Sequence, residues 1–307
     1  MSPFKNILVL GAGELGTEIL LSLAQHPAIS SETNISVVLR PSSITSPGPS
    51  KAVELERLKA NNITLVPADI STSSQSTLSS LFSAYDTVIS ATGFSAGRGT
   101  QLKLARAVLD AGVLRYIPWQ FGVDYDIIGR GSAQDLFDEQ LDVRDLLRSQ
   151  YRTKWVIIST GMFTSFLFER AFGVVDAEKR VVTALGSWEN RVTVTAPVDI
   201  GRVTAEVVLE ESFGDPDNVV YVAGDTVSYG RVAEIVESVI GRAFDRRVRT
   251  VDTARRYLAQ EPENGLFKYQ IVFGEGRGVA WDAEKTWNAQ RGMRLQTAAE
   301  WARENLA

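Results

Sequence analysis

Apolar runs alternate with amphipathic segments along the first half of the chain. Residues 6–10 (NILVL) form a continuous apolar run, which is typical of a strand buried on both faces. Residues 35–40 and 86–93 predict further strands, whereas residues 100–111 and 135–150 carry apolar positions at helical spacing. Strands that alternate with helices in this way predict an α/β fold of the Rossmann type, which is a doubly wound parallel sheet.

Three more strands complete the predicted sheet. One ends at Asp69, one starts at Val113 and leads into a loop at residues 119–122, and one spans residues 154–160. The Pro-, Ser- and Gly-rich residues 41–50 predict a loop after the second strand.

The pattern becomes looser after residue 160, which predicts a second and smaller part of the molecule. We expect residues 1–158 to form the Rossmann domain. Residues 159–307 are expected to form a smaller C-terminal substrate-binding lobe, with some elements that return to the main sheet.

Composition excludes several classes of function. The 307-residue chain is 44% hydrophobic and 22% charged, as ordinary globular proteins are, and it has no cysteine. The lack of cysteine excludes disulfides, thiolate catalysis and cysteine zinc sites. A net charge of -5 disfavours nucleic acid or an anionic membrane as partner. The apolar runs are too short for a membrane span, so a cytoplasmic location is expected.

A glycine-rich turn follows the first strand and opens the first predicted helix. Its G-x-G-x-x-G spacing is typical of dinucleotide-binding turns, in which the glycines permit a tight bend, close approach of a pyrophosphate and close helix packing. The N–H groups at the start of the helix then face the phosphates. The predicted cofactor-binding residues in this turn are Gly11, Gly13, Glu14, Leu15 and Gly16.

The residue that ends the second strand favours NADP over NAD. An acid there would bind the ribose 2′-hydroxyl, whereas Arg40 can pair with a 2′-phosphate. Ser42 adds a hydroxyl donor. Asp69, after the third strand, either borders the adenine or serves as a turn or helix-capping residue. Small residues at the end of the fourth strand let a cofactor ribose lie close to the backbone; they are Ala91, Thr92 and Gly93.

The chain resembles the isoflavone reductase-like branch of the NmrA-like family, which consists of atypical short-chain dehydrogenases. The stretches that carry the resemblance are LGAGELG, VVLRPSS, DTVISATG, AVLDAGVLRYIPWQFGVDYD, FDEQLDVRDLL and VDIGRVTAE, and together they span nearly the whole chain. Similar fungal proteins are described as aromatic-alcohol or isoflavone-type reductases. The resemblance implies an NADPH-dependent reductase of aromatic or polyketide-like small molecules in secondary metabolism, with the segment at residues 111–124 beside the nicotinamide.

Two positions depart from the family pattern. Gln140 stands where family reductases carry a lysine, and an amide cannot deliver a proton at neutral pH as an ammonium can. Trp119 and Gln120 stand where the family commonly has a small residue and an acid, so Trp119 adds an aromatic face beside the cofactor. We include Gln120 among the cofactor-binding residues.

Other polar and aromatic residues are candidates for the substrate site. Tyr125 could donate its phenolic proton to a substrate oxygen, oriented by Asp124, or both could belong to an Asx-type turn with an exposed tyrosine. Phe163 and Phe166 could form an aromatic pocket wall, with Phe121, or could pack in the core. Together with Gln140, the catalytic candidates are Tyr125 and Asp124.

Three functions remain open at this point. The first is reduction of a carbonyl, enone or benzylic position with NADPH. The second is a non-catalytic NADP-binding regulator, which the missing lysine favours, and the third is a non-redox isomerase or cyclase on the same scaffold. The expected partner is a small aromatic or polyketide-like substrate, and a homodimer is among the expected assemblies. One histidine and no cysteine disfavour a metal site.

Overall fold

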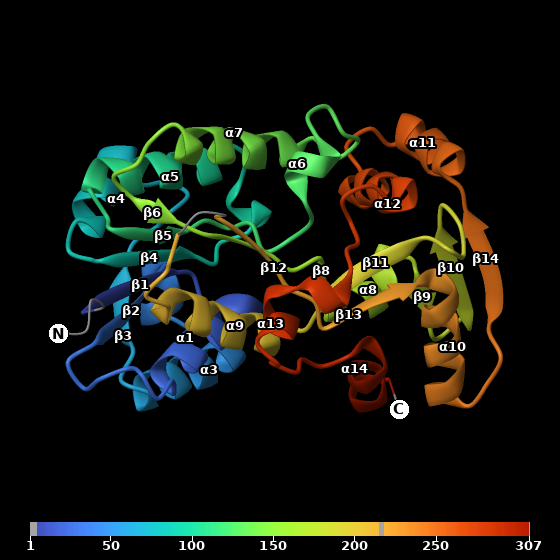
Figure 1. Ribbon diagram of the computed structural model, residues 1–307, viewed down its shortest axis with the longest axis horizontal. Helices are drawn as coiled ribbons and strands as arrows, with labels where there is room; N and C mark the ends of the chain where they lie inside the picture. The colour runs from blue at the N-terminus through green and yellow to red at the C-terminus, as the bar shows by residue number, and fades with distance from the viewer. Residues whose placement is uncertain (1–4, 215–217, 307) are drawn as a thin grey trace. The chain divides into compact units, whose positions relative to one another are not determined.

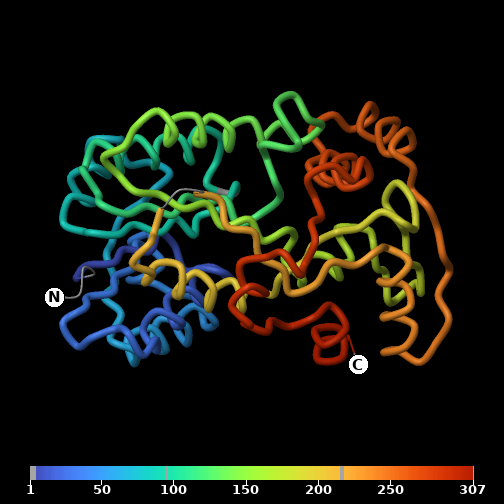
Figure 2. Tube along the Cα trace, viewed as in Figure 1, coloured from blue at the N-terminus to red at the C-terminus, as the bar shows by residue number. Residues whose placement is uncertain are grey.

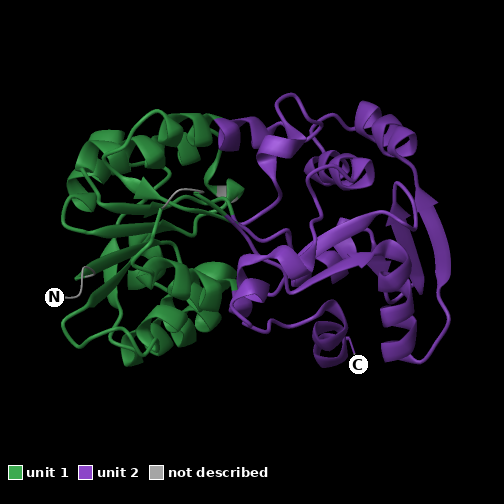
Figure 3. Cartoon of the chain, in the orientation of Figure 1, with its two compact units in different colours: residues 1–120, 142–158, 200–219 green, residues 121–141, 159–199, 220–307 purple. Residues whose placement is uncertain are grey.

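The computed structural model describes residues 5–214 and 218–306 and divides the chain into two compact units (Figure 3). Unit 1 consists of residues 1–120, 142–158 and 200–219. Unit 2 consists of residues 121–141, 159–199 and 220–307. Each unit therefore collects three segments of the chain.

Unit 1 is built around a six-stranded sheet in the order β3-β2-β1-β4-β5-β6, the strand order of a Rossmann fold. Every neighbouring pair in this sheet is parallel, as predicted. The strands are β1 (Asn6–Leu10), β2 (Asn34–Leu39), β3 (Thr64–Pro67), β4 (Thr87–Ser90), β5 (Arg115–Ile117) and β6 (Lys154–Trp155). Residues 7–10 of β1 are completely buried, because β1 lies in the middle of a sheet that helices cover on both faces.

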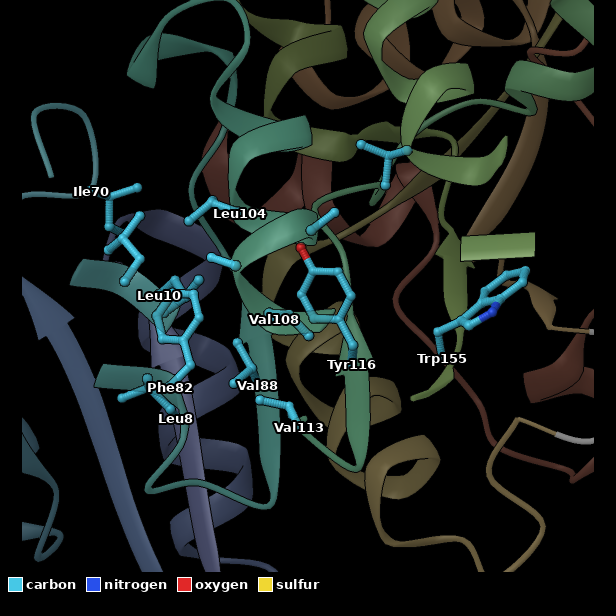
Figure 4. Packing of buried hydrophobic residues seen from close by; sticks show 14 of the residues in the cluster. Leu8, Leu10, Ile70, Phe82, Val88, Leu104, Val108, Val113, Tyr116 and Trp155 are labelled. Carbon is cyan, nitrogen blue, oxygen red and sulfur yellow. The ribbon is translucent and has the colours of Figure 1, made fainter. Parts of the chain in front are cut away.

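Helices cover the two faces of this sheet. In Figure 1, α1, α3 and α9 lie on one face and α4, α5 and α7 on the other. Their bounds are α1 (Glu14–Ala24), α3 (Pro49–Ala60), α4 (Gln75–Phe82), α5 (Thr100–Ala111), α7 (Leu136–Arg148) and α9 (Pro197–Leu209), and a short 3-10 turn, η1 (Phe94–Ala96), follows β4. Figure 4 shows the apolar side chains that join β1, β4 and β5 to α4 and α5, such as Leu8, Phe82 and Val108.

The prediction of a loop over residues 41–50 is wrong for residues 41–45 and 49–50, which are helical. A short helix, α2 (Pro41–Thr45), begins directly after Arg40. Proline is well suited to the first turn of a helix, because its missing N–H needs no partner there and its φ is already helical. The same reason explains why α3 begins at Pro49.

The second half of the chain contributes a helix to unit 1. Figure 2 shows the yellow α9 segment among the blue segments of this unit. A Cβ atom on Gly201 would lie 2.6 Å from the backbone carbonyl of Glu18, so α9 approaches α1 backbone to backbone. In addition, β12 (Val219–Tyr221) pairs with β7 (Ile157–Ser159), which follows β6 after one residue.

Unit 2 contains two three-stranded sheets, in the orders β14-β10-β9 and β13-β11-β8. Their strands are β8 (Met162–Phe163), β9 (Val175–Asp176), β10 (Val181–Leu185), β11 (Arg191–Thr195), β13 (Asp225–Ser228) and β14 (Asp245–Arg249). The helices and 3-10 turns are α6 (Tyr125–Ile128), α8 (Thr164–Phe168), η2 (Arg170–Phe172), α10 (Tyr229–Ile240), α11 (Val251–Gln260), α12 (Gly265–Glu275), η3 (Ala283–Lys285), α13 (Trp287–Gln290) and α14 (Ala298–Asn305).

Tyr116 carries a hydroxyl that the core of unit 1 does not satisfy. The side chain is completely buried beside Val108 (Figure 4), and its hydroxyl has no hydrogen-bond partner among the described residues. Burial also raises the pKa of this phenol, so the group stays neutral. We expect Tyr116→Phe to raise the free energy of unfolding by about 1 kcal/mol, because an unpaired buried hydroxyl is removed with little change in shape.

Urea unfolding of the Tyr116→Phe protein measures this change. Tyr151→Phe is the matched control, since the Tyr151 side chain is exposed and its hydroxyl already meets water. A loss of stability in Tyr116→Phe would show that the hydroxyl has a partner in solution.

Candidate functional site

The three glycines after β1 have different surroundings. Gly11 has a φ of +95°, and a Cβ on Gly16 would lie 2.2 Å from the carbonyl oxygen of Gly11, so both positions require glycine for the turn itself. A Cβ on Gly13 would meet no atom within 4 Å. The space next to Gly13 is therefore open, and we call this space at the start of α1 the cradle. The fold itself does not require glycine at this position.

This cradle lies at the start of α1. Gly13 is the N-cap residue and provides no side-chain cap, so the first N–H groups of the helix are directed outward. Helix N-termini with this arrangement attract phosphate groups. Glu14 is exposed, whereas the Leu15 side chain is 3% exposed and packs in the core, so Leu15 can contribute to a site here only through its backbone.

The residues that follow β4 pack against the glycine turn. Thr92 donates its hydroxyl proton to the carbonyl of Leu10 over 2.7 Å, and Ala91 lies against the backbone of Gly16. Gln101, which the sequence did not indicate, donates from Nε2 to the carbonyl of Thr92 over 2.8 Å. This hydrogen bond links α5 to the residues that follow β4.

Trp119 packs on the glycine that follows these residues. A Cβ on Gly93 would lie 3.1 Å from Cζ2 of Trp119. The ring is half-buried and stands near the carboxyl ends of β4 and β5, the edge at which Rossmann sheets bind their ligands. It can therefore serve as an aromatic wall there.

One cationic side chain stands at the end of β2, and another stands beside the glycine turn. Arg40 and Ser42 are exposed at the start of α2, directly after β2. The Lys51 ammonium donates to the carbonyl of Ala12 over 2.6 Å and to Glu54 over 2.6 Å. Lys51 was missed by the sequence analysis because 39 residues separate it from Ala12, and only the packing of α3 against α1 brings them together.

Asp69 forms a turn after β3. Its carboxylate accepts a hydrogen bond of 2.9 Å from the N–H of Ser71, as in an Asx turn. The Lys103 ammonium organises the same loop by donating to the carbonyls of Ile70, Ser71 and Ser73. The turn-forming alternative for Asp69 is thus present in the structure, and contact with an adenine remains a prediction.

Gln120, the last residue of the first segment of unit 1, is completely buried. Its Oε1 accepts a hydrogen bond of 2.7 Å from Nε of Arg144, which is itself completely buried. The FDEQLDVRDLL stretch contains Arg144 four residues after Gln140, and Gln140 is also completely buried. Both positions at which the chain departs from the family pattern therefore include a completely buried glutamine, Gln120 in one and Gln140 in the other.

Asp124 and Tyr125 begin α6 in unit 2. The Asp124 carboxylate caps the helix by accepting from the N–H of Ile127 over 3.2 Å, and it accepts from the Tyr221 hydroxyl over 2.6 Å. Tyr125 is 3% exposed, so the alternative of an exposed tyrosine is wrong, and Asp124 acts as a helix cap. A Cβ on Gly122 would lie 2.7 Å from the Tyr125 hydroxyl, which explains glycine at that position.

Aromatic rings form a continuous cluster in unit 2. Tyr125 packs edge-on against Phe137 with 4.9 Å between ring centroids, and Phe137 and Phe166 both contact Tyr269. Burial raises the pKa of Tyr269 to about 12, so its hydroxyl stays a proton-bearing donor at neutral pH. Phe163 is half-buried at the end of β8, and Phe121 is buried. Two of the predicted aromatic residues thus share one cluster, together with a tyrosine that the sequence analysis did not single out.

Two kinds of feature are not found in the described part of the chain. Residues 5–214 and 218–306 contain no group of three His, Asp or Glu side chains placed to hold a metal ion. The same residues form no helix that combines the length and the apolar character of a membrane span.

Comparison with known sequences identifies the family. A sequence model of the NmrA-like family matches residues 3–290. An NmrA-like family domain-containing oxidoreductase of Gibberella moniliformis (strain M3125 / FGSC 7600) is 48% identical over 300 residues, which cover 97% of each chain. The chain therefore belongs to the NmrA-like family, as its motifs predict.

Comparison with solved structures supports the same fold. The binary complex of leucoanthocyanidin reductase with NADPH from Vitis vinifera matches with a TM-score of 0.80 and 18% identity over 97% of this chain and 98% of that chain. An isoflavone reductase matches with a TM-score of 0.78 and 17% identity over 98% of this chain and 99% of that chain. At these identities the likeness concerns the fold.

Proposed function

We propose that this protein is an NADPH-dependent oxidoreductase. The observation that carries the proposal is the open cradle at Gly13, under the N-terminus of α1, with Lys51 beside it. The curated relative is an oxidoreductase by name, and one of the fold neighbours is a complex with NADPH. The glycine turn and the N–H groups of α1 would hold the pyrophosphate, and Arg40, Ser42 and Lys51 would hold the 2′-phosphate.

Arg40 is expected to set the preference for NADPH. Arg40→Ala should weaken NADPH binding by about 10- to 100-fold, because a charge-assisted hydrogen bond of about 1.5–3 kcal/mol is lost. NADH has no 2′-phosphate, so its affinity should change little. Fluorescence titration with both nucleotides tests this, and Arg57→Ala on the exposed face of α3 is the control. Equal losses for NADPH and NADH would contradict the assignment of Arg40.

When bound, the nicotinamide supplies a hydride, and the protein contributes orientation and hydrogen bonds. We propose that the substrate is an aromatic or polyketide-like small molecule of secondary metabolism, reduced at a carbonyl, enone or benzylic position. Trp119 offers a flat apolar surface for such a ring in unit 1, and the aromatic cluster with Phe166 offers one in unit 2. Gln140 and Tyr125 would hydrogen-bond the substrate oxygen, with the Tyr125 phenol as the group able to deliver a proton.

A non-catalytic NADP-binding regulator is the second candidate. It is favoured by Gln140, since this buried amide replaces a residue that can donate a proton. Loss of a proton donor typically slows a reaction by about 10²- to 10⁴-fold.

The deciding experiment combines nucleotide binding with turnover. NADPH oxidation is followed against a panel of aromatic aldehydes, ketones and enones for the wild type and for Gln140→Lys, after titration shows that both bind NADPH. We expect turnover of at least one panel member by the wild type. Turnover by Gln140→Lys alone would identify the natural protein as a regulator, and failure to bind NADPH would overturn both functions.

A further inference from the structure

Unit 2 contains a pocket that the proposed function does not use. Its volume is about 440 Å³, and it lies between the loop that follows α6 and the two helices α11 and α12. Figure 1 shows these two helices beside each other, with the loop after α6 next to them. All of the lining residues belong to unit 2, whereas the glycine turn belongs to unit 1.

The walls of the pocket are partly apolar. Ile128 of α6 and Leu258 of α11 face it half-buried, and Ile271 and Val272 of α12 form buried parts of the wall. A volume in the range of about 300–1,000 Å³ with apolar walls is typical of a small-molecule site. Apolar walls alone would fit many neutral molecules.

The charged residues of the pocket restrict the class of ligand that it can bind. Three arginines line it, Arg130, Arg255 and Arg277, against one carboxylate, Glu275. The lining therefore carries an excess of two positive charges in a chain whose net charge is -5. Guanidinium groups bind carboxylates and phosphates through paired hydrogen bonds.

The arginines differ in their partners. Arg255 is paired with Glu275 over 2.7 Å, and this ion pair joins α11 to α12 at the exposed rim. Arg277 is exposed and makes no ion pair with any described residue. Its segment is held on both sides, because the Gly276 N–H donates to the carbonyl of Val272 and the Gly278 carbonyl accepts from the N–H of Asp124 over 2.8 Å. The Arg277 guanidinium, which has no ion-pair partner among the described residues, therefore lines the pocket from a turn whose backbone is held on both sides.

We propose that this pocket binds a small organic anion, one with an apolar body and a carboxylate or phosphate group. The apolar walls would cover the body, and Arg277 would hold the anionic group, with Arg255 beside it. Inorganic phosphate would leave the apolar walls in water, and a neutral molecule would leave the guanidinium groups without an anion.

The test uses 1-naphthyl phosphate and 1-naphthoate as anionic probes, with 1-naphthol as the neutral counterpart, in calorimetric titrations of the whole protein. Both anions should bind at least about 10-fold more tightly than 1-naphthol, since each good charge-assisted contact corresponds to that factor or more. If only one of them does, that anionic group is the one the pocket recognises. Arg277→Gln should weaken binding by about 10-fold. Glu275→Gln should strengthen it, because the change removes a repulsive carboxylate and releases Arg255.

Two controls separate this site from other sources of binding. Arg247→Gln, an exposed arginine of β14 outside the pocket, should leave probe affinity unchanged. Arg40→Ala should also leave it unchanged, which excludes the predicted 2′-phosphate site and keeps the test independent of the proposed function. The proposal is overturned if 1-naphthol binds as tightly as both anions, if Arg277→Gln behaves as Arg247→Gln does, or if Glu275→Gln weakens binding.

Discussion

Gly13→Ala is expected to abolish tight NADPH binding while leaving the fold intact. No atom lies within 4 Å of the position that the new Cβ would occupy, and the backbone of Gly13 has a φ of -94°, which alanine adopts without strain. The methyl group would instead fill the space in which the pyrophosphate should approach the N–H groups of α1. Losing two hydrogen bonds to a charged group at about 1.5–3 kcal/mol each gives a loss in affinity of about 100-fold or more.

Gly16→Ala is the matched comparison in the same turn. Its Cβ would lie 2.2 Å from the carbonyl oxygen of Gly11 and 3.2 Å from the Cβ of Ala91, so the turn and the helix must move apart. We expect a loss of about 3 kcal/mol in the free energy of unfolding, the upper part of the usual cost of overpacking. Fluorescence titration and thermal unfolding of both variants separate the two roles. If Gly13→Ala binds NADPH as the wild type does, the cofactor does not lie on this cradle.

Arg144→Ala is expected to lower the free energy of unfolding by about 3–5 kcal/mol. Arg144 is among the largest completely buried side chains of the chain, and Nε donates to Gln120 over 2.7 Å. Truncation leaves a cavity and removes a charge-assisted hydrogen bond between two completely buried side chains. Urea unfolding measures the change.

Arg148→Ala provides the control for Arg144, because Arg148 lies one turn further along α7 and is exposed. Its effect should stay within about 0.5 kcal/mol, as is usual for surface substitutions. The double variant Gln120→Leu/Arg144→Met should recover part of the lost stability, because replacing both polar partners by apolar groups of similar size leaves no buried donor or acceptor unsatisfied. An Arg144→Ala protein as stable as Arg148→Ala would contradict a structural role for the buried guanidinium.

The sheet and the glycine turn could be predicted from sequence because their signals are local. The apolar run of β1 and the glycine spacing after it lie within residues 6–16, so neighbouring residues alone define a buried strand, a tight turn and a helix start. The family could be identified for a related reason, since its motifs are short continuous stretches. The helix α2 was missed because proline and serine occur in loops and in first turns alike.

The sequence alone determined the fold class, the family and the position of the glycine turn after β1. Only the tertiary structure decided which side chains meet. Lys51 reaches Ala12 across 39 residues, Tyr221 reaches Asp124 across 97, and the pocket arginines come from three separate segments. The physical reason is that side-chain contacts between distant segments depend on how helices and strands pack, and no local pattern of apolar and polar residues encodes that packing.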